Sequence, residues 1–142
     1  MPDSQQPIVS KDKTLLQTKA IQEMLKETYW GQVRTLDEIS DTITNSRCYG
    51  LYLGDRQIGF ARVLSDTVVF AYLMDVLIHK DFKGLGFSRI LLDVIFNDPE
   101  YKRIQRWNLA TRDAHGLYEK YGFSRLSQPE VFMEKILVHW RD

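Results

Sequence analysis

The chain has 142 residues, of which 44% are hydrophobic and 27% charged, as expected for one soluble globular domain with a sizeable core. Its 19 basic and 19 acidic side chains give a formal net charge of zero, which excludes a basic overall field for nucleic acid. One cysteine and three histidines argue against a structural zinc site, and we expect no metal cofactor.

The sequence contains no apolar run long enough to span a bilayer, and its N-terminal stretch lacks the basic-then-apolar pattern of a signal peptide. These features predict a cytoplasmic protein that binds neither membrane nor nucleic acid. No repeat, low-complexity segment or linker interrupts the chain, so a single domain is expected to cover residues 1–142.

A short strand at residues 7–10 and two helices are expected first. Apolar side chains recur at helical spacing over residues 14–29, which predicts an amphipathic helix. Thr35 and Glu38 form a capping-box pattern that opens a second helix, extending to about residue 45.

The period then changes to that of strands. Residues 47–53 and 56–64 are two strand-like runs separated by a Gly-Asp pair, which predicts a tight antiparallel hairpin. Gly59 lies inside the second run and indicates a bulge or a close backbone approach.

The rest of the chain alternates strands and helices. A nearly continuous apolar strand over residues 67–78 leads to a helix over residues 86–97 and a strand over residues 105–110, parallel to the previous one through this crossover. A short helix over residues 114–121 and a last strand over residues 131–139 complete the chain. This order predicts a mixed sheet with helices on its faces.

The junction between the apolar strand and the next helix carries the sequence Lys-Gly-Leu-Gly-Phe-Ser, residues 83–88. Backbone N–H groups of a glycine-containing loop at a helix N-terminus can bind an anion such as a phosphate. A Walker loop is excluded because Phe87 and Ser88, and not Lys-Ser/Thr, follow Gly86. A dinucleotide fingerprint fits poorly because Arg89 occupies the place of its third small residue.

Two motifs, in the expected order, resemble the GCN5-related N-acetyltransferase (GNAT) superfamily. The sequence HKDFKGLGFSRILL, residues 79–92, is similar to the family's glycine-spaced acetyl-CoA loop and the helix after it. The Leu-Tyr-Glu-Lys-x-Gly-Phe pattern of residues 117–123 is similar to the family's later motif. The resemblance covers residues 47–138 and implies an α/β (α+β) fold, with a mixed, mostly antiparallel central sheet that is splayed between two parallel central strands.

The resemblance also implies direct transfer of the acetyl group from acetyl-CoA to an amine. Residues 83–88 correspond to the pyrophosphate loop, and the preceding strand supplies backbone contacts to the acetyl and pantetheine parts. The implied cofactor-binding residues are Val76, Leu77, Ile78, Lys83, Gly84, Leu85, Gly86, Phe87, Ser88, Thr111 and Tyr118.

Three positions depart from the family pattern. Lys83 stands for the usual Arg or Gln and keeps the charge but loses the planar fork. Ser88 stands for the closing Gly or Ala, and its small side chain still lets the backbone approach a phosphate. Thr111 stands for a frequent Asn and offers a hydroxyl in place of an amide for one pantetheine contact.

Tyr118 corresponds to the family's tyrosine general acid, which protonates the departing thiolate. The alternative is an aromatic core residue in a stripe with Leu117 and Tyr121. Asp75 is our candidate for the base that deprotonates the incoming amine, because it is a carboxylate within an apolar strand. Its alternative is a structural carboxylate bonded to a neighbouring helix or to backbone N–H groups.

His79 and His115 are weaker candidates for the base and suit surface or capping positions better. Cys48 has no partner base in the sequence, so a nucleophilic role is not expected. The acceptor pocket is expected to involve Tyr29, Trp30 and Tyr72, with Phe132 as a further wall residue. For Tyr29 and Trp30 the alternative is a hydrophobic plug under the next loop.

This aromatic set favours a small-molecule amine as the acceptor. A protein or peptide acceptor and a non-catalytic acetyl-CoA-binding regulatory domain remain the alternatives. The resemblance is also compatible with a homodimer, although no residue of the sequence specifies one.

Overall fold

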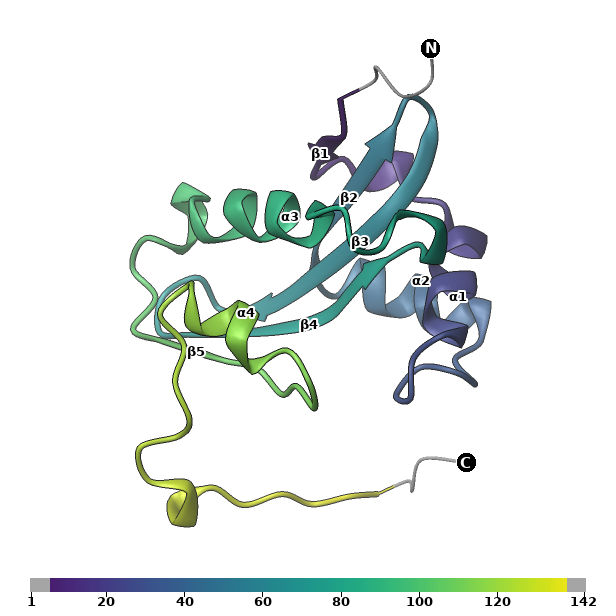
Figure 1. Ribbon diagram of the computed structural model, residues 1–142. Coiled ribbons are helices and arrows are strands. Elements are labelled where there is room, and N and C mark those ends of the chain that lie inside the picture. Colours follow the sequence, from purple (N-terminus) through teal and green to yellow (C-terminus); the bar gives the residue numbers. More distant parts are fainter. Residues whose placement is uncertain (1–5, 138–142) are drawn as a thin grey trace. The chain divides into compact units, whose positions relative to one another are not determined.

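A five-stranded mixed sheet is the frame of the first of two compact units, residues 1–109 and 110–142. The structure, a computed structural model, describes residues 6–137. The strand order is β1-β2-β3-β4-β5, and all neighbours are antiparallel except β4 and β5, which are parallel (Figure 1). This arrangement confirms the mixed, mostly antiparallel sheet. The strands are β1 Ile8–Ser10, β2 Arg47–Leu53, β3 Arg56–Ser65, β4 Phe70–Ile78 and β5 Arg106–Asn108.

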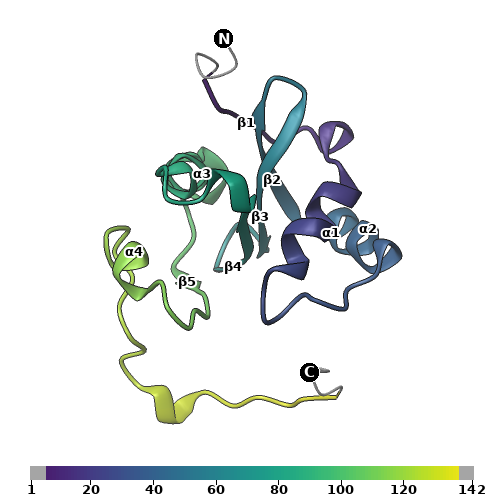
Figure 2. The same cartoon turned by 45° about the vertical axis from the view of Figure 1, so that its right-hand side comes forward.

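Helices cover both faces of this sheet. Figure 2 shows α1 (Thr18–Lys26) and α2 (Leu36–Thr44) on one face and α3 (Phe87–Phe96) on the other. The capping box predicted at the start of α2 is present in full, since the Thr35 hydroxyl accepts the Glu38 N–H and the Glu38 carboxylate accepts the Thr35 N–H. The core under α1 and α2 is made by Ile21, Met24, Leu25, Ile39, Cys48, Phe60 and Leu77.

The predicted hairpin joins β2 and β3 with the expected bounds. Its register shifts between Leu51 and Tyr52, because β3 has one extra residue at Ile58. A Cβ on Gly59 would lie 3.1 Å from the Leu77 carbonyl oxygen, so a side chain there would press on the next strand. Gly59 therefore marks both a bulge and a close backbone approach, as its position in an apolar run predicted.

Several expected elements are shorter than predicted, among them the strand predicted over residues 105–110, which spans only Arg106–Asn108. The helix predicted over residues 14–29 is interrupted: a 3-10 helix at Lys13–Leu15 ends in an extended residue before α1 begins. The strand predicted over residues 67–78 begins only at Phe70. The Asp66 carboxylate accepts the N–H groups of residues 68–70 and holds them in a turn, which delays the strand.

The second unit, residues 110–142, contains α4 (His115–Glu119) and is described by itself. Gly122 follows this helix with φ +91°, as the predicted helix end requires. The strand predicted over residues 131–139 is wrong within the described part of the chain. Pro129–Val131 is a 3-10 helix and residues 132–137 have no regular structure, while residues 138 and 139 lie outside the described residues. An apolar run forms a strand only where another strand takes its backbone hydrogen bonds, so the apolar pattern alone does not specify a strand here.

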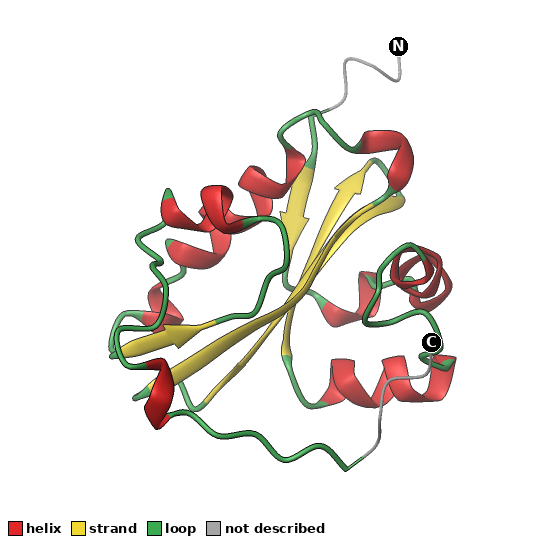
Figure 3. Ribbon diagram, turned by 60° about the horizontal axis from the view of Figure 1, so that its bottom comes forward, coloured by secondary structure: helices red, strands yellow, loops and turns green. Residues whose placement is uncertain are grey.

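Short helical turns connect several of these elements, as Figure 3 shows in red. Besides the two already named, they are Lys80–Phe82 and Pro99–Tyr101. Among the described residues, no helix combines the length and apolar character needed to cross a membrane.

Candidate functional site

The loop between β4 and α3 bends at two glycines with left-handed backbone. Gly84 has φ +78° and Gly86 has φ +81°, conformations that a side chain would strain. A Cβ on either residue would meet no atom within 4 Å, so the space in front of the loop backbone is open. The two glycines therefore serve the turn and leave room for a ligand to approach the backbone.

This loop presents unused hydrogen-bond donors. Within residues 6–137, the N–H groups of residues 84–88 donate to no protein acceptor. Gly86 is the N-cap of α3 and has no side chain to satisfy the first turn. Free N–H groups at a helix N-terminus, together with the helix dipole, favour a bound anion.

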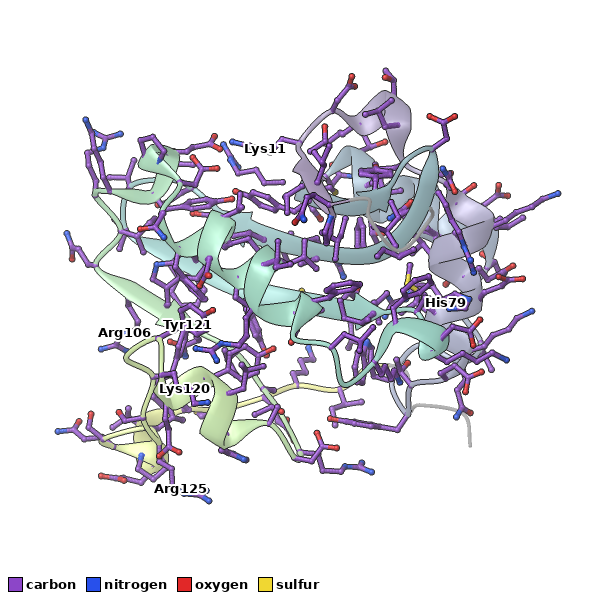
Figure 4. The ribbon with its side chains drawn as sticks, turned by 45° about the horizontal axis from the view of Figure 1, so that its top comes forward. Lys11, His79, Arg106, Lys120, Tyr121 and Arg125 are labelled. Carbon is purple, nitrogen blue, oxygen red and sulfur yellow. The ribbon has the colours of Figure 1, made fainter. Side chains whose placement is uncertain are left out.

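His79 fixes the entrance to this loop at the carboxyl end of β4 (Figure 4). The ring Nδ1 of His79 accepts the backbone N–H of Asp81 at 3.1 Å. The backbone N–H of His79 donates to the Ile58 carbonyl at 2.8 Å. The Arg56 guanidinium lies over the Phe82 ring at 5.2 Å. His79 thus has the capping position that the sequence favoured over a catalytic one.

Strand β4 is open along part of one edge. Only residues 70–72 pair with β5, so within the described chain residues 73–78 extend past the end of that strand. Unpaired backbone groups of this kind can bind an extended ligand. The stretch contains Val76, Leu77 and Ile78, for which acetyl and pantetheine contacts are predicted.

A bulge lies in the middle of this open stretch. The register of β3 with β4 shifts between Phe60 and Arg62, because Asp75 and Val76 together face Ala61. Asp75 has φ +50°, which is uncommon for a residue other than glycine. Such a bulge redirects a side chain and is frequent beside active sites.

The redirected Asp75 side chain is buried and receives three hydrogen bonds. Its Oδ1 accepts from the Trp30 indole N–H at 2.7 Å, and its Oδ2 accepts from Arg34 at 2.8 Å and from Arg62 at 2.7 Å. Arg62 also donates to the Ser46 hydroxyl at 3.0 Å. These contacts suit a structural carboxylate, but its partners are side chains of the α1–α2 connection and of β3, not a helix or backbone N–H groups as the alternative stated. The role of Asp75 as a base stays a prediction.

Sequence reasoning missed Arg34 and Arg62. Arg34 precedes the α2 capping box, where it looks like an ordinary loop residue. Arg62 stands alone among apolar residues in the run Ile-Gly-Phe-Ala-Arg-Val-Leu, and a charge inside a buried strand was the available signal. The sequence around Arg34 and Arg62 does not show that both pair with Asp75, because Asp75 is distant in sequence from both.

The predicted acceptor residues Tyr29 and Trp30 follow α1. Their rings meet edge to face with centroids 5.0 Å apart. Tyr29 is exposed, whereas the Trp30 indole is bonded to Asp75. The pair is therefore more than an apolar plug, because one of its members belongs to the buried polar cluster.

Tyr72 lies on the same face of the sheet as this cluster. It pairs with Leu64, and Met74 pairs with Arg62, so these side chains share one face. Phe60, two residues before Arg62, packs against α1 on that face. Tyr72, Arg62 and the helices α1 and α2 are thus on one side of β4.

The remaining predicted residues lie in the second unit. Tyr118 of α4 is buried, and burial raises the pKa of its hydroxyl to about 12. Its ring meets that of Phe123 edge to face at 6.0 Å. The Thr111 hydroxyl accepts the N–H of Ala114 and supports the start of α4. Phe132 is exposed beyond the last 3-10 helix.

Cys48 is buried, and this burial raises the pKa of its thiol to about 11, which agrees with an inert side chain. Among residues 6–137, no group of three or more His, Cys, Asp or Glu side chains could hold a metal ion.

The family model for the acetyltransferase (GNAT) domain matches residues 44–125, which is more than half of the chain. The chain belongs to the GNAT acetyltransferase family. A solved GNAT-family structure from Xanthomonas campestris pv. campestris has a TM-score of 0.89 at 38% identity, covering 93% of this chain and 94% of that one. FG08082 of Gibberella zeae, which carries an acetyltransferase name, is 28% identical over 80% of this chain and 76% of its own length.

SA2161 of meticillin-resistant Staphylococcus aureus shares the GNAT fold, with a TM-score of 0.75 at 18% identity over 95% of this chain and 100% of that one. The resemblance seen in the two motifs is confirmed by the family match. The protein is an acetyl-CoA-dependent N-acetyltransferase, with acetyl-CoA as its co-substrate.

Proposed function

We propose that this N-acetyltransferase acetylates the primary amine of a small molecule. The observation that carries the proposal is an open hollow of about 420 Å³ beside the segment between α1 and α2, a volume typical of small-ligand sites. The same segment contributes Trp30 and Arg34 to the buried cluster around Asp75. The hollow is lined by Gln22, Gln32, Val33, Arg34, Thr35, Leu36 and Asp37.

In this proposal the loop and the open edge of β4 hold the co-substrate. The free N–H groups of residues 84–88 bind the pyrophosphate, with Lys83 adding a positive charge. Backbone groups of residues 76–78 hydrogen-bond the pantetheine and polarise the thioester carbonyl. The open space in front of Gly84 and Gly86 supports this fit.

The chemistry requires two proton movements. Acetyl-CoA supplies an activated acyl group: the amine nitrogen bonds to the carbonyl carbon as the carbon–sulfur bond breaks. Tyr118 donates its hydroxyl proton to the sulfur, and a pKa of about 12 keeps that hydroxyl protonated at neutral pH. The proton of the amine passes to Asp75 or to a water chain.

The general test is release of CoA measured against a panel of small primary amines and lysine-containing peptides. We expect turnover on at least one small amine and a lower kcat/KM on peptides. Turnover on peptides alone would replace the small-molecule acceptor with a protein one. Tight acetyl-CoA binding without any turnover would favour a non-catalytic domain.

Replacing Tyr118 tests its proposed role as the acid. Tyr118→Phe should lower kcat by about 100-fold, the lower range for loss of a general acid, with little change in acetyl-CoA affinity. Steady-state kinetics and calorimetry separate the two quantities. Tyr121→Phe, two residues beyond the last residue of the same helix, is the matched control and should keep kcat. Equal losses of kcat and of affinity in Tyr118→Phe would indicate a packing role.

Replacing Gly86 tests the loop. Gly86→Asp puts a side chain and a negative charge where φ is +81°, and should weaken acetyl-CoA binding by at least about 100-fold, or roughly 2.7 kcal/mol. The control is Gly54→Asp, which places the same side chain at φ +55° in the β2–β3 turn. Calorimetry should show unchanged affinity in the control, and unchanged affinity in Gly86→Asp would refute the loop assignment.

A further inference from the structure

The cluster around Asp75 carries an excess of positive charge. Arg34 and Arg62 share the single carboxylate of Asp75, so the three side chains have a net charge of +1. All three are largely removed from water: the exposed fractions of the side chains are 13% for Arg34, 7% for Arg62 and 4% for Asp75. A buried charge without a partner is costly, so a net charge at this place calls for an explanation.

The two guanidinium groups also have hydrogen-bond donors to spare. Each guanidinium carries five N–H bonds. Arg34 donates through Nη1 to Asp75, and Arg62 donates through Nε to Asp75 and through Nη1 to Ser46. No other acceptor among residues 6–137 takes a hydrogen bond from either side chain. The remaining donors are therefore available to a further group.

None of these spare donors is completely enclosed by the protein. Within the described chain, the one side-chain nitrogen or oxygen that is both fully buried and unpartnered is the Tyr52 hydroxyl. None of the unused nitrogens of Arg34 and Arg62 is therefore fully buried, although most of each side chain is removed from water. Arg34 in addition lines the hollow beside the α1–α2 segment.

The backbone holds Arg34 in place before any ligand arrives. Its N–H donates to the Gly31 carbonyl at 3.2 Å, and its carbonyl accepts from the Gln22 side chain at 3.3 Å. The Gly31 N–H in turn donates to the Thr28 hydroxyl at 2.9 Å. These bonds hold the backbone, and the bond from Nη1 to Asp75 holds the guanidinium, so Arg34 loses little conformational entropy when it binds an anion.

The position of the cluster ties it to the acceptor. Asp75 directly precedes residues 76–78, which form the proposed acetyl-binding edge of β4. Trp30, a predicted wall of the acceptor pocket, donates to the same carboxylate, and Tyr72 shares the face of Arg62. An anion bound by the two arginines would therefore lie among the proposed acceptor residues.

We propose that the acceptor amine carries a carboxylate, and that Arg34 and Arg62 bind this carboxylate. One negative charge brings the cluster to neutrality, and the planar fork of a guanidinium matches the two oxygens of a carboxylate. This assignment rests on the proposed small-molecule acceptor and specifies its class. Arg34 and Arg62 then select the substrate, and Asp75 holds both arginines in place.

The first experiment measures binding without acetyl transfer. Calorimetry compares 3-phenylpropionate with 3-phenylpropanamide, which has the same shape and no charge. The wild type should bind the acid at least about tenfold more tightly than the amide. Arg34→Gln should remove this preference, while Arg103→Gln, at an exposed arginine outside the cluster, should keep it. Equal binding of acid and amide by the wild type overturns the proposal.

A second variant covers the case in which Arg34→Gln does not fold. Arg34→Lys keeps the positive charge and loses the planar guanidinium. The ratio of the affinity for 3-phenylpropionate to that for 3-phenylpropanamide should therefore be lower than in the wild type but stay above one. A preference in Arg34→Lys equal to that of the wild type contradicts recognition by the guanidinium fork. The binding of acid and amide by the wild type tests the carboxylate site even if neither variant folds.

The second experiment separates this inference from the function on which it rests. CoA release is measured with phenylalanine and with phenylalaninamide, and kcat/KM should favour phenylalanine by about tenfold or more. Turnover of both amines without preference for the acid would refute the carboxylate site and leave the small-molecule function standing. Selective binding of 3-phenylpropionate without turnover of any small amine would support the site and refute that function.

Discussion

Two clusters of the first unit place one carboxylate between two cations, and they differ in burial and in net charge. Glu100 accepts from Arg47 at 2.7 Å and from Lys11 at 3.2 Å, close to Asp98, which also pairs with Lys11. Lys11, labelled in Figure 4, joins the segment after β1 to the connection between α3 and β5. With two cations and two carboxylates this surface cluster is neutral.

The cluster around Asp75 has the same chemistry in a different environment. It is buried, it has one cation in excess, and it lies on a strained bulge of β4. A surface cluster with zero net charge joins chain segments and requires no further charged group. Unbalanced charge beside an open strand edge indicates a site that a ligand completes.

The largest effect on stability should come from the buried carboxylate. Asp75→Asn removes the charge that two guanidinium groups share, and loss of one partner from a buried ion pair costs roughly 3–5 kcal/mol. Urea unfolding at pH 7 measures this free energy. Asp41→Asn, at an exposed position of α2, makes the same chemical change and should stay within about 0.5 kcal/mol of the wild type.

The same variant decides between the two roles weighed for Asp75. A stable Asp75→Asn protein that binds acetyl-CoA and has lost turnover would favour the base over the structural carboxylate. Loss of stability together with activity would favour the structural role that the three hydrogen bonds indicate.

A smaller effect is expected at Tyr49, which links the surface cluster to the interior. Its buried hydroxyl donates to Asp98 at 2.7 Å and lies 2.8 Å from the Tyr101 hydroxyl. Tyr49→Phe should cost about 1.5–3 kcal/mol, because the lost hydrogen bond has a charged acceptor. The control is Tyr52→Phe on the same strand, whose buried hydroxyl has no partner in the described chain, so unfolding should show no loss there. Equal losses in both variants would mean that packing, and not the hydrogen bond, stabilises Tyr49.

The contrast between the clusters also explains what could be predicted from the sequence. The hairpin, the capping box of α2 and the glycine turns before α3 depend on neighbouring residues, and all were predicted at nearly their observed bounds. The cluster around Asp75 unites residues 30, 34, 46, 62 and 75, whose pairing is created by folding. Within the described residues, the strand predicted over residues 131–139 was wrong for the same reason, since an apolar run does not specify a neighbouring strand.

The smallest effect should come from Glu100, whose ion pairs are at the surface. Its side chain is 34% exposed, so Glu100→Gln should cost less than about 1 kcal/mol at pH 7, and less again at high salt. The hydrogen bond from Arg47 outweighs partial burial and holds the pKa of Glu100 below its ordinary value of 4.5.

A carboxylate with a lowered folded-state pKa stabilises the protein above its unfolded pKa and loses that contribution as pH falls through the folded value. The difference in unfolding free energy between wild type and Glu100→Gln should therefore be constant near neutrality and decrease as the pH falls from the unfolded pKa through the lower folded-state pKa. Urea unfolding between pH 7 and pH 3 measures it. A difference that persisted unchanged at the acid end would mean that the Glu100 side chain stabilises the connection by packing. The surface cluster would then no longer be the electrostatic counterpart of the one around Asp75.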